Sequence, residues 1–507
     1  MTDWSRAPLT EAANAIAAGK TTSRDVVEAC LDRIARLNDR LNCFVDIDWK
    51  GARAAADAAD RSQRSGAVLG ALHGVPLAHK DMYYRAGRVS ACGSKLRADW
   101  RAPYTATALQ RLDQAGALEI GRLVMVEFAM GPHGYNQNYP RCGNPWNPDH
   151  IPCGSSSGSG VAVGARLVHA SLGSDTGGSI RCPAAVSGVV GLLPTNGRVS
   201  RRGAMPMSHS LDAVGPLART ARDCARILRV IAGHDPADAS SLAIPVPHYE
   251  AELAGTGALP TIGLARGYFD TGVTAEVRKA HDRAADDLAR AGCAVEEVNM
   301  PAGLLDEIAE LHPLIMKSEG SANHLSTMRE REPDYTFEVG NRLHAGFFVP
   351  ATSYIRAVKL RGMYLRAFAQ AMFSKADLIL TPVLPMAVPT IAETSGRTGK
   401  AYLDMVVALT RNTKVINYLG LPAISVQCGF TANGLPTAFQ LVGRPFNEAA
   451  LLRAADRYQQ ATEWHAREPK LVADAAPAMP CDVWNRFGGT TSPLRSGPQG
   501  RVSITAE

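Results

Sequence analysis

The sequence predicts an α/β fold with a substantially parallel sheet, and three observations support this prediction. Short apolar runs alternate with helical patterns, as in "TALQRLDQAGALEIG", where a helix leads into a strand. Hydrophobic residues make up 46% of the chain and charged residues 20%, which is the balance of a globular protein. A chain of 507 residues can also fold around one sheet, as large α/β enzymes do, and no internal repeat is evident.

The apolar pattern of the first 60 residues predicts helices. In "TTSRDVVEACLDRIARLNDRLNCF" the apolar positions share one face, and Thr22 with Asp25 forms a candidate cap at the start. The alanine-rich stretch Ala52 to Ala59 continues the helical character. We expect residues 1–60 to pack on the core or on a subunit interface.

The rest of the chain alternates strands and helices. "LHGVPLAHKD", "KADLILTPVLPMAVPTI" and "LPAISVQCGF" predict strands, and "SGVAVGARLVHASLGSD" predicts a helix of small residues that runs into a strand. The segment from about 230 to 370 contains charged helices and is either a less central part of the domain or a cap over the site. Residues 475–507 are rich in Gly, Pro and Ser, and we expect this tail to be partly disordered.

The composition excludes several classes of protein. No run of 18 apolar residues occurs, and the N-terminus lacks the order of a signal peptide, so we expect a cytoplasmic protein without a membrane partner. A net charge of +6 over 507 residues is too small to indicate a surface that binds nucleic acid. The ten cysteines form no CxxC pair and no Cys/His group, which favours reduced thiols over disulfides or a zinc site.

One glycine-rich stretch, "GSDTGGSIRCPAA" from Gly173 to Ala185, stands out. Its simplest interpretation is a turn that needs glycine for its backbone geometry. The spacing fits neither a P-loop nor a dinucleotide motif, which argues against a nucleotide site. A third interpretation is nucleophilic: consecutive N–H groups converge on an oxyanion, and Ser179 at the end of the row attacks once a base removes its proton.

Two other stretches supply groups for such a reaction. Lys80 ends an apolar run in "HGVPLAHKDMYY", and a lysine in apolar surroundings has a lowered pKa and can act as a base. "PCGSSSGSG" offers Ser155, Ser156 and Ser157 before the small-residue helix. The ordinary alternatives are a surface lysine at a strand end and a serine cluster that caps a helix.

These residues together resemble the amidase signature family of hydrolases. The central block runs from Cys153 to Thr195, and further blocks such as "GRLVMVEFAMGPHGYNQNYPRCGNPWNP" and "SLDAVGPLARTARD" follow the family order over roughly residues 8 to 460. The resemblance implies a three-layer α/β/α fold with a large twisted mixed sheet of about 11 strands flanked by helices. It also implies that residues 61–474 form the catalytic domain.

By this resemblance the catalytic residues are Lys80, Ser155 and Ser179, in a Ser-cisSer-Lys triad that needs no cofactor and no metal. The N–H groups of Thr176, Gly177, Gly178 and Ser179 would hold the oxyanion. The remaining implied site residues are Met130 as a wall of the acyl pocket, for which core packing is an equal alternative, and Asp175, Arg181 and Ser156 as structural support. Cys153 and Ser157 replace family glycines, which affects the loop shape but removes no catalytic group.

The substrate is predicted less directly. In the family branch formed by the A subunit of glutamyl-tRNA amidotransferase, an aspartate holds the ammonium group of glutamine, and the matching position here is at or near Thr410. We therefore expect a stand-alone amidase for a small neutral or aryl-bearing amide, with esters or carbamates as further substrates and no nucleic-acid partner; a homodimer is left open. The alternatives are an amidotransferase-type glutaminase in a multi-subunit complex and a catalytically idle binding protein.

Overall fold

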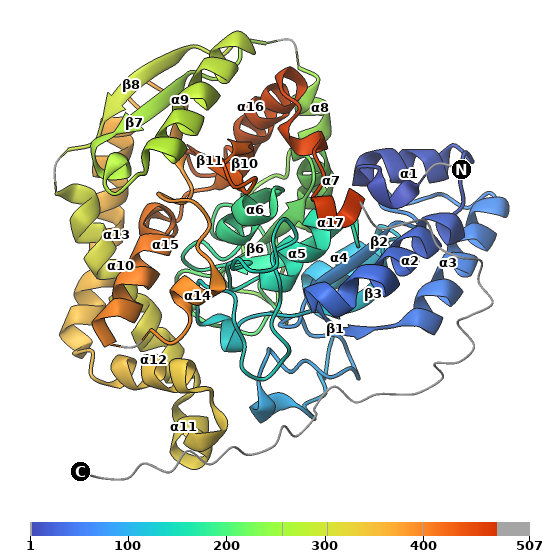
Figure 1. The fold of residues 1–507 in the computed structure, drawn as a ribbon, viewed down its shortest axis with the longest axis horizontal. Coiled ribbons are helices and arrows are strands. Elements are labelled where there is room, and N and C mark those ends of the chain that lie inside the picture. Colours follow the sequence, from blue (N-terminus) through green and yellow to red (C-terminus); the bar gives the residue numbers. More distant parts are fainter. Residues whose placement is uncertain (1–2, 256, 302, 398, 474–507) are drawn as a thin grey trace. The chain divides into compact units, whose positions relative to one another are not determined.

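Helices enclose a large mixed sheet, and a smaller sheet lies beside it (Figure 1). The computed structural model describes residues 3–255, 257–301, 303–397 and 399–473. The large sheet has eight strands in the order β4-β6-β5-β10-β11-β9-β7-β8, and the small sheet has three in the order β1-β3-β2. The expected α/β fold with a large mixed sheet is confirmed, but the strands of the described residues are divided between two sheets.

The strands are four to eight residues long. Their bounds are β1 (Phe44–Ile47), β2 (Pro76–Lys80), β3 (Leu118–Leu123), β4 (Ala170–Asp175), β5 (Val190–Leu193), β6 (Ala213–Ala218), β7 (Ile262–Arg266), β8 (Val295–Asn299), β9 (Leu378–Pro382), β10 (Ala423–Phe430) and β11 (Pro436–Gly443).

The α-helices range in length from 4 residues in α14 to 22 residues in α13. Their bounds are α1 (Leu9–Ala17), α2 (Ser23–Leu41), α3 (Trp49–Arg64), α4 (Thr107–Gln114), α5 (Ser157–Gly164), α6 (Arg181–Ser187), α7 (Ala221–Ile231), α8 (Tyr249–Leu253), α9 (Ala275–Arg290), α10 (Leu304–Asn323), α11 (Leu325–Arg331), α12 (Phe337–Phe347), α13 (Ala351–Met372), α14 (Ile391–Thr394), α15 (Gly399–Leu419), α16 (Glu448–Ala461) and α17 (Lys470–Ala473).

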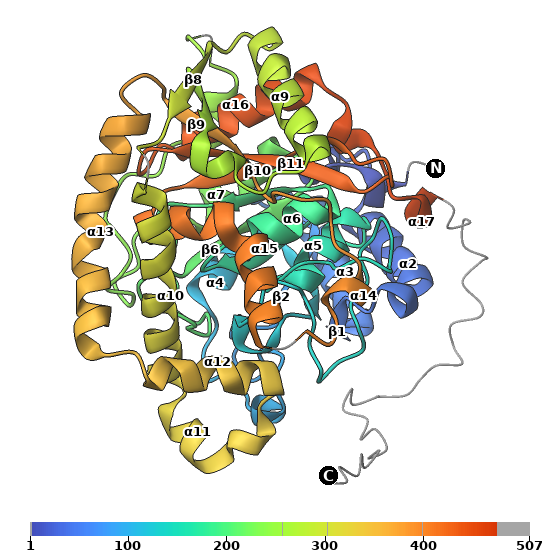
Figure 2. The ribbon, with the colours of Figure 1, turned by 60° about the vertical axis from the view of Figure 1, so that its left-hand side comes forward.

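Helices cover both faces of the large sheet. Figure 2 shows α9 and α16 on one side of β10 and β11, and α6 and α15 on the other. Helix α7 packs on α16, and α5 packs on α6, so each layer continues across the sheet. This is the layered arrangement that buries both faces of a sheet.

Most neighbouring strands of the large sheet run antiparallel, so the expectation of a substantially parallel sheet is wrong. Within the described residues of this sheet, only β7 pairs in parallel, with β8 and β9, while β4, β6, β5, β10, β11 and β9 are joined by antiparallel pairings. The chain turns tightly from β10 into β11 through residues 431–435, and such a short connection can join only antiparallel strands. Alternation of helix and strand along the sequence did not reveal this.

The expected N-terminal helices are present and begin as predicted. Thr22 Oγ1 accepts a hydrogen bond from the Asp25 N–H at 3.0 Å, and the Asp25 carboxylate accepts from the Thr22 N–H at 3.3 Å, so the capping box at α2 is confirmed. One strand, β1, separates α2 from α3. Residues 3–60 belong to the same compact unit as the rest of the described chain. The boundary at residue 61 stays a prediction, and the tail 475–507 lies outside the described residues.

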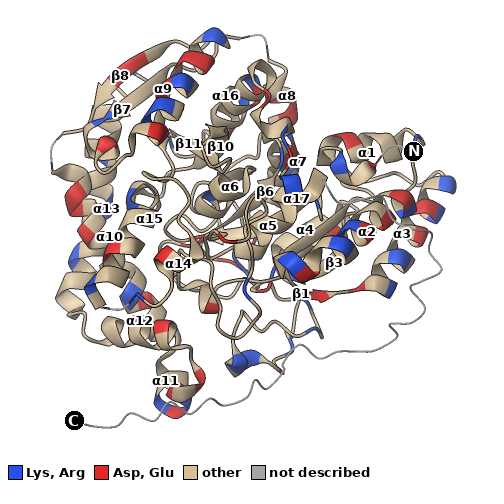
Figure 3. Cartoon of the chain, viewed as in Figure 1, with Lys and Arg blue, Asp and Glu red and all other residues tan. Residues whose placement is uncertain are grey.

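Charges of both signs lie along the outer helices. Figure 3 shows them on α2, α3 and α9, whereas the central helix α5 carries none. Among the helices of the described residues, none has both the length and the apolar character that a membrane span requires.

Helix α5 is fully buried and consists of small residues, which lets neighbouring backbone approach closely. A Cβ on Gly158 would lie 2.6 Å from the carbonyl oxygen of Cys43 and 2.7 Å from the backbone nitrogen of Val124. These contacts hold the N-terminus of α5 against the small sheet. The serines that precede α5 therefore have a fixed position relative to β2 and β3.

We predict that Gly158→Val destabilises the protein strongly, because the added side chain would overlap backbone atoms that have no room to move. The loss should be about 3 kcal/mol or more, measured by urea unfolding. The matched control is Gly362→Ala on α13, where only an arginine side chain lies within 4 Å of the new Cβ. The control should be neutral or stabilising by about 1 kcal/mol; equal unfolding midpoints for the two variants would contradict the packing argument.

Candidate active site

Lys80 is the last residue of β2, and it is completely buried. Its Nζ lies 2.7 Å from Ser155 Oγ and 2.8 Å from Ser174 Oγ. Ser174 is on β4 of the large sheet, so the lysine bridges the two sheets. The expected pairing of Lys80 with Ser155 is therefore present in the geometry, while Ser174 is a partner that the sequence did not indicate.

Burial lowers the pKa of Lys80 to about 7, although the Asp212 and Asp175 carboxylates act in the opposite direction. Near neutral pH a large share of this amine is therefore uncharged. A neutral amine has two hydrogens and one lone pair: it can donate to Ser174 and accept the proton of Ser155. Ser174 thus directs the lone pair of Lys80 towards Ser155.

The serine segment before α5 adopts the conformation that the family resemblance implies. The Gly154–Ser155 peptide bond is cis. The Ser156 N–H donates to the carbonyl oxygen of Ser179 at 3.4 Å, which brings this segment beside the nucleophile candidate. The Ser156 hydroxyl also donates to the Ser174 carbonyl at 3.3 Å and accepts from the Ser174 N–H at 3.4 Å, so it joins the segment to β4.

Ser179 lies in the loop between β4 and α6, at the wall of a cavity of about 380 Å³. Gly154, Thr176, Gly177 and Gly178 line the same cavity. The two glycine-rich stretches of the sequence thus meet at one cavity, while the roles of Ser155 as relay and Ser179 as nucleophile stay predictions.

The backbone donors of the loop are divided between two roles. The Gly178 N–H donates to Asp175 Oδ1 at 2.6 Å, so it is not free to bind an oxyanion. In the described part of the chain, the N–H groups of Thr176, Gly177 and Ser179 have no hydrogen-bond acceptor. These three groups remain available to a ligand in the cavity.

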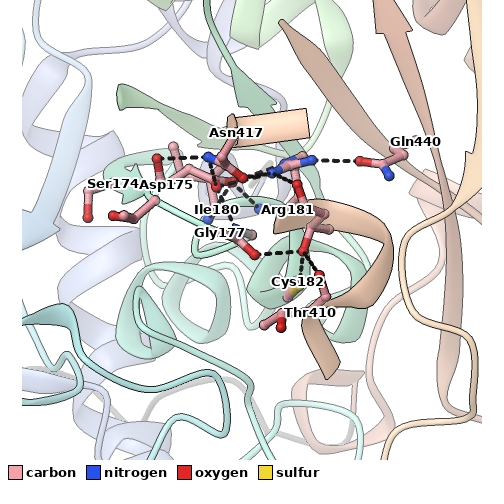
Figure 4. A network of polar contacts seen from close by, with 12 residues as sticks. Ser174, Asp175, Gly177, Ile180, Arg181, Cys182, Thr410, Asn417 and Gln440 are labelled. Carbon is pink, nitrogen blue, oxygen red and sulfur yellow. Dashed lines mark hydrogen bonds and ion pairs between the residues drawn. The ribbon is translucent and has the colours of Figure 1, made fainter. Parts of the chain in front are cut away.

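Asp175 and Arg181 form a buried ion pair that fixes this loop (Figure 4). Arg181 Nε lies 3.1 Å from Asp175 Oδ2, and its other nitrogens donate to Gln440 at 2.8 Å and to Asn417 at 2.6 Å. Asp175 also accepts from the Ile180 N–H at 3.1 Å. Burial alone would raise the pKa of Asp175, but the Arg181 charge and these hydrogen bonds lower it.

Gly178 shows why the loop needs glycine. It has a φ of +126°, and a Cβ there would lie 2.4 Å from Thr413 Oγ1. Thr413 on α15 in turn donates to the Gly177 carbonyl at 2.7 Å. Helix α15 therefore packs directly against the loop.

Several groups around the loop were not predicted from the sequence. His312 Nε2 donates to the Thr176 carbonyl at 2.9 Å, and burial lowers the pKa of His312 to about 4, so the ring is neutral. Thr176 Oγ1 donates to Asp212 at 2.6 Å. These residues come from distant parts of the chain, and no local motif marks them.

Met130 lies beside the cavity rather than on its wall. It is buried and contributes to a separate small space with Met207, Met316 and Leu343. Its neighbours Ala129 and Gly131 line the catalytic cavity instead. The expected role of Met130 in the acyl pocket stays a prediction.

Charged side chains from outside the family motifs also line the cavity. They are Glu310 and Lys317 on α10, Arg342 on α12 and Lys414 on α15. The segment from about 230 to 370 thus provides part of the cavity wall through α10 and α12. Thr410, also on α15, lines the cavity as well.

Comparison with known proteins agrees with this site. The family model described as Amidase matches residues 25–452. The chain belongs to the amidase family. Its curated relatives include the A subunit of the glutamyl-tRNA(Gln) amidotransferase of Roseiflexus sp. (strain RS-1), which is 40% identical over 489 residues, 92% of this chain and 98% of that protein.

Solved structures of other proteins have the same architecture as this amidase. A chain from a vestigial protein complex, described as revealing the evolutionary origins of an s-triazine catabolic enzyme, is 34% identical, with a TM-score of 0.83 over 90% of this chain and 98% of the other. The A subunit of the glutamyl-tRNA(Gln) amidotransferase of Thermotoga maritima is 30% identical, with a TM-score of 0.71 over 85% of this chain and 90% of the other.

These relatives correct two expectations. The prediction of a stand-alone amidase for small neutral or aryl-bearing amides is wrong, because proteins named as amidotransferase subunits match nearly the whole chain. The expectation of no nucleic-acid partner is also contradicted, since the relatives are subunits of an enzyme named for glutamyl-tRNA(Gln). The identity of the single residue Thr410 was not enough evidence to choose between the stand-alone amidases and the amidotransferase A subunits.

We predict that Arg181→Met lowers the free energy of unfolding by about 3–5 kcal/mol, because it leaves the Asp175 carboxylate buried without a countercharge. Urea unfolding measures the change. The control is Arg290→Met, which removes an arginine that is 71% exposed from its ion pair with Asp287. This control should lose less than about 1 kcal/mol. Similar losses in both variants would show that the buried pair does not hold the loop.

Proposed function

We propose that this amidase hydrolyses primary amides through an acyl-enzyme on Ser179 and works as the ammonia-releasing subunit of a multi-subunit amidotransferase. The observation that carries the chemical part is the buried Lys80 amine, 2.7 Å from Ser155 and 2.8 Å from Ser174. The names of relatives that match 92% of the chain or more support the second part. The side-chain amide of glutamine is the reference substrate for this function.

The reaction begins with proton transfer along the serine pair. Neutral Lys80 accepts the proton of Ser155 while Ser155 accepts the proton of Ser179, and Ser179 Oγ attacks the amide carbon. The developing charge on the carbonyl oxygen is stabilised by the N–H groups of Gly177 and Ser179, which have no other acceptor in the described chain. The Gly178 N–H acts indirectly, because its bond to Asp175 holds the loop in place.

The relay then runs in reverse. Lys80, now protonated, returns the proton through Ser155 to the departing nitrogen, so the C–N bond breaks and ammonia leaves. Water attacks the acyl-enzyme with the same base, the ester bond to Ser179 breaks, and the carboxylate product is released. Each proton is returned, so the enzyme ends in its starting state.

We predict that Ser179→Ala abolishes ammonia release and that Ser155→Ala and Lys80→Ala each reduce kcat by on the order of 10⁴-fold or more, because the three residues act as one unit. A coupled ammonia assay measures this. A fluorophosphonate probe with mass spectrometry tests the nucleophile separately, since labelling should occur on Ser179 alone. The matched control is Ser157→Ala, whose buried hydroxyl has no hydrogen-bond partner in the described chain. Near-normal turnover by Lys80→Ala would refute the assigned base.

The pKa of about 7 for Lys80 predicts a specific pH profile. The base must be uncharged, so kcat/KM should rise about tenfold per pH unit on the acid side and level off above about pH 7. Steady-state kinetics across buffers of constant ionic strength would measure the profile. A flat profile between about pH 5 and 9, with enzyme that remains folded, would contradict a lysine base.

A further inference from the structure

The cavity beside Ser179 is lined by more positive than negative side chains. Lys317, Arg342 and Lys414 line it, and Glu310 is the one acidic residue among the described lining residues. None of the three cationic groups forms a salt bridge in the described part of the chain. The Glu338 carboxylate lies 2.8 Å from His133 Nε2, and the Arg342 charge also contributes to lowering the pKa of Glu338.

Lys414 is the most enclosed of these cations, with 9% of its surface exposed. Its ammonium has no hydrogen-bond acceptor among the described residues, and its charged neighbours are Glu310 and Arg411. The place of a Cβ on Gly177 lies 3.7 Å from the Cβ of Lys414, so the lysine stands directly beside the loop that carries Ser179. The ammonium is accessible rather than fully enclosed, and Lys414 lines the cavity, so an anionic ligand there can pair with this charge.

Lys317 and Arg342 lie on the neighbouring helices α10 and α12 and repel each other. Burial lowers the pKa of Lys317, and the Arg342 charge lowers it further. Arg342 has an unpartnered buried Nε and lies 5.6 Å from the centre of the Tyr402 ring. Both cations line one cavity, and neither forms a salt bridge among the described residues, an arrangement that suits a carboxylate ligand.

The same wall offers little to a cationic group. Thr410 presents a hydroxyl that already donates to the Val406 carbonyl at 2.7 Å. Glu310 is exposed to solvent and interacts with Lys414. An ammonium group on the substrate would therefore face a net positive wall, where like charges repel each other.

We infer that the preferred amide of this enzyme has a net negative charge: a primary amide that carries a carboxylate and no amino group, with the carboxylate bound by Lys414 and by the pair Lys317 and Arg342. Half-amides of dicarboxylic acids are this class of substrate. The inference rests on the proposed amide hydrolysis at Ser179. It adds that glutamine is a poorer substrate than its deaminated analogue glutaramate. The ammonium of glutamine offsets the negative charge of its carboxylate, whereas glutaramate carries a net charge of −1.

The test compares three amides of equal chain length with the full-length protein: glutaramate, glutamine and the neutral pentanamide. We expect kcat/KM for glutaramate to exceed that for glutamine at least tenfold. Lys414→Met should reduce kcat/KM for glutaramate about 10- to 100-fold, mainly through KM, and leave pentanamide within about twofold. Lys414→Arg should restore part of the loss. The matched control is Lys359→Met, on the exposed side of α13, which should change nothing.

Binding is measured separately from turnover. In the Ser179→Ala protein, the product analogue glutarate should bind at least tenfold more tightly than glutamate by calorimetry, and adding Lys414→Met should remove this preference.

The outcomes separate the two proposals. If glutamine is hydrolysed and bound as well as its anionic analogue, the inference fails and the proposed function stands. If no amide is hydrolysed and the probe does not label Ser179, the proposed function fails, and the inference fails with it. If Lys414→Met leaves both kcat/KM for glutaramate and glutarate binding unchanged, the assigned anion site is wrong.

Discussion

The Asp175–Arg181 ion pair is the contact on which the arrangement of the site depends. Both side chains are completely buried, so each charge requires the other. Through Gln440 on β11 and Asn417 on α15, the pair ties the loop that carries Ser179 to two elements that are more than 230 residues away in sequence. The loop can then use the Gly178 N–H for its own support and leave the N–H groups of Gly177 and Ser179 open to the cavity.

The sequence predicted the residues that lie within motifs. Lys80 and Ser155 meet at hydrogen-bonding distance, and the Asp175–Arg181 support has the expected form. The individual strands and helices around these motifs were also predicted, because apolar runs and helical periodicity are local properties. The roles assigned to Ser179 and to the oxyanion donors follow from the same motifs and await experiment.

The pairing of strands and the composition of the cavity wall could not be predicted in this way. Antiparallel pairing of β4, β6 and β5 depends on how distant segments meet. His312, Asp212 and Lys414 reach the loop from elsewhere in the chain, and each is an ordinary residue in its local sequence. The substrate prediction rested on Thr410, which is visible next to a motif, and the relatives overturned it. Lys317 and Arg342 join the cavity wall only through the fold, so the sequence did not connect them to the site.

Lys80 and the strand that leads to Ser179 belong to different sheets. Lys80 ends β2 in the small sheet, and Asp175 ends β4 in the large one. The Leu172 N–H of β4 donates to His79 Nδ1 of β2 at 3.2 Å, and burial keeps this histidine neutral by lowering its pKa to about 4. The seam between the sheets is therefore also the place where Lys80 contacts Ser174 of the large sheet. Under the proposed mechanism, a chain whose two sheets had formed but not docked would contain every proposed catalytic side chain and yet be inert, so catalysis itself would report that the last stage of assembly is complete.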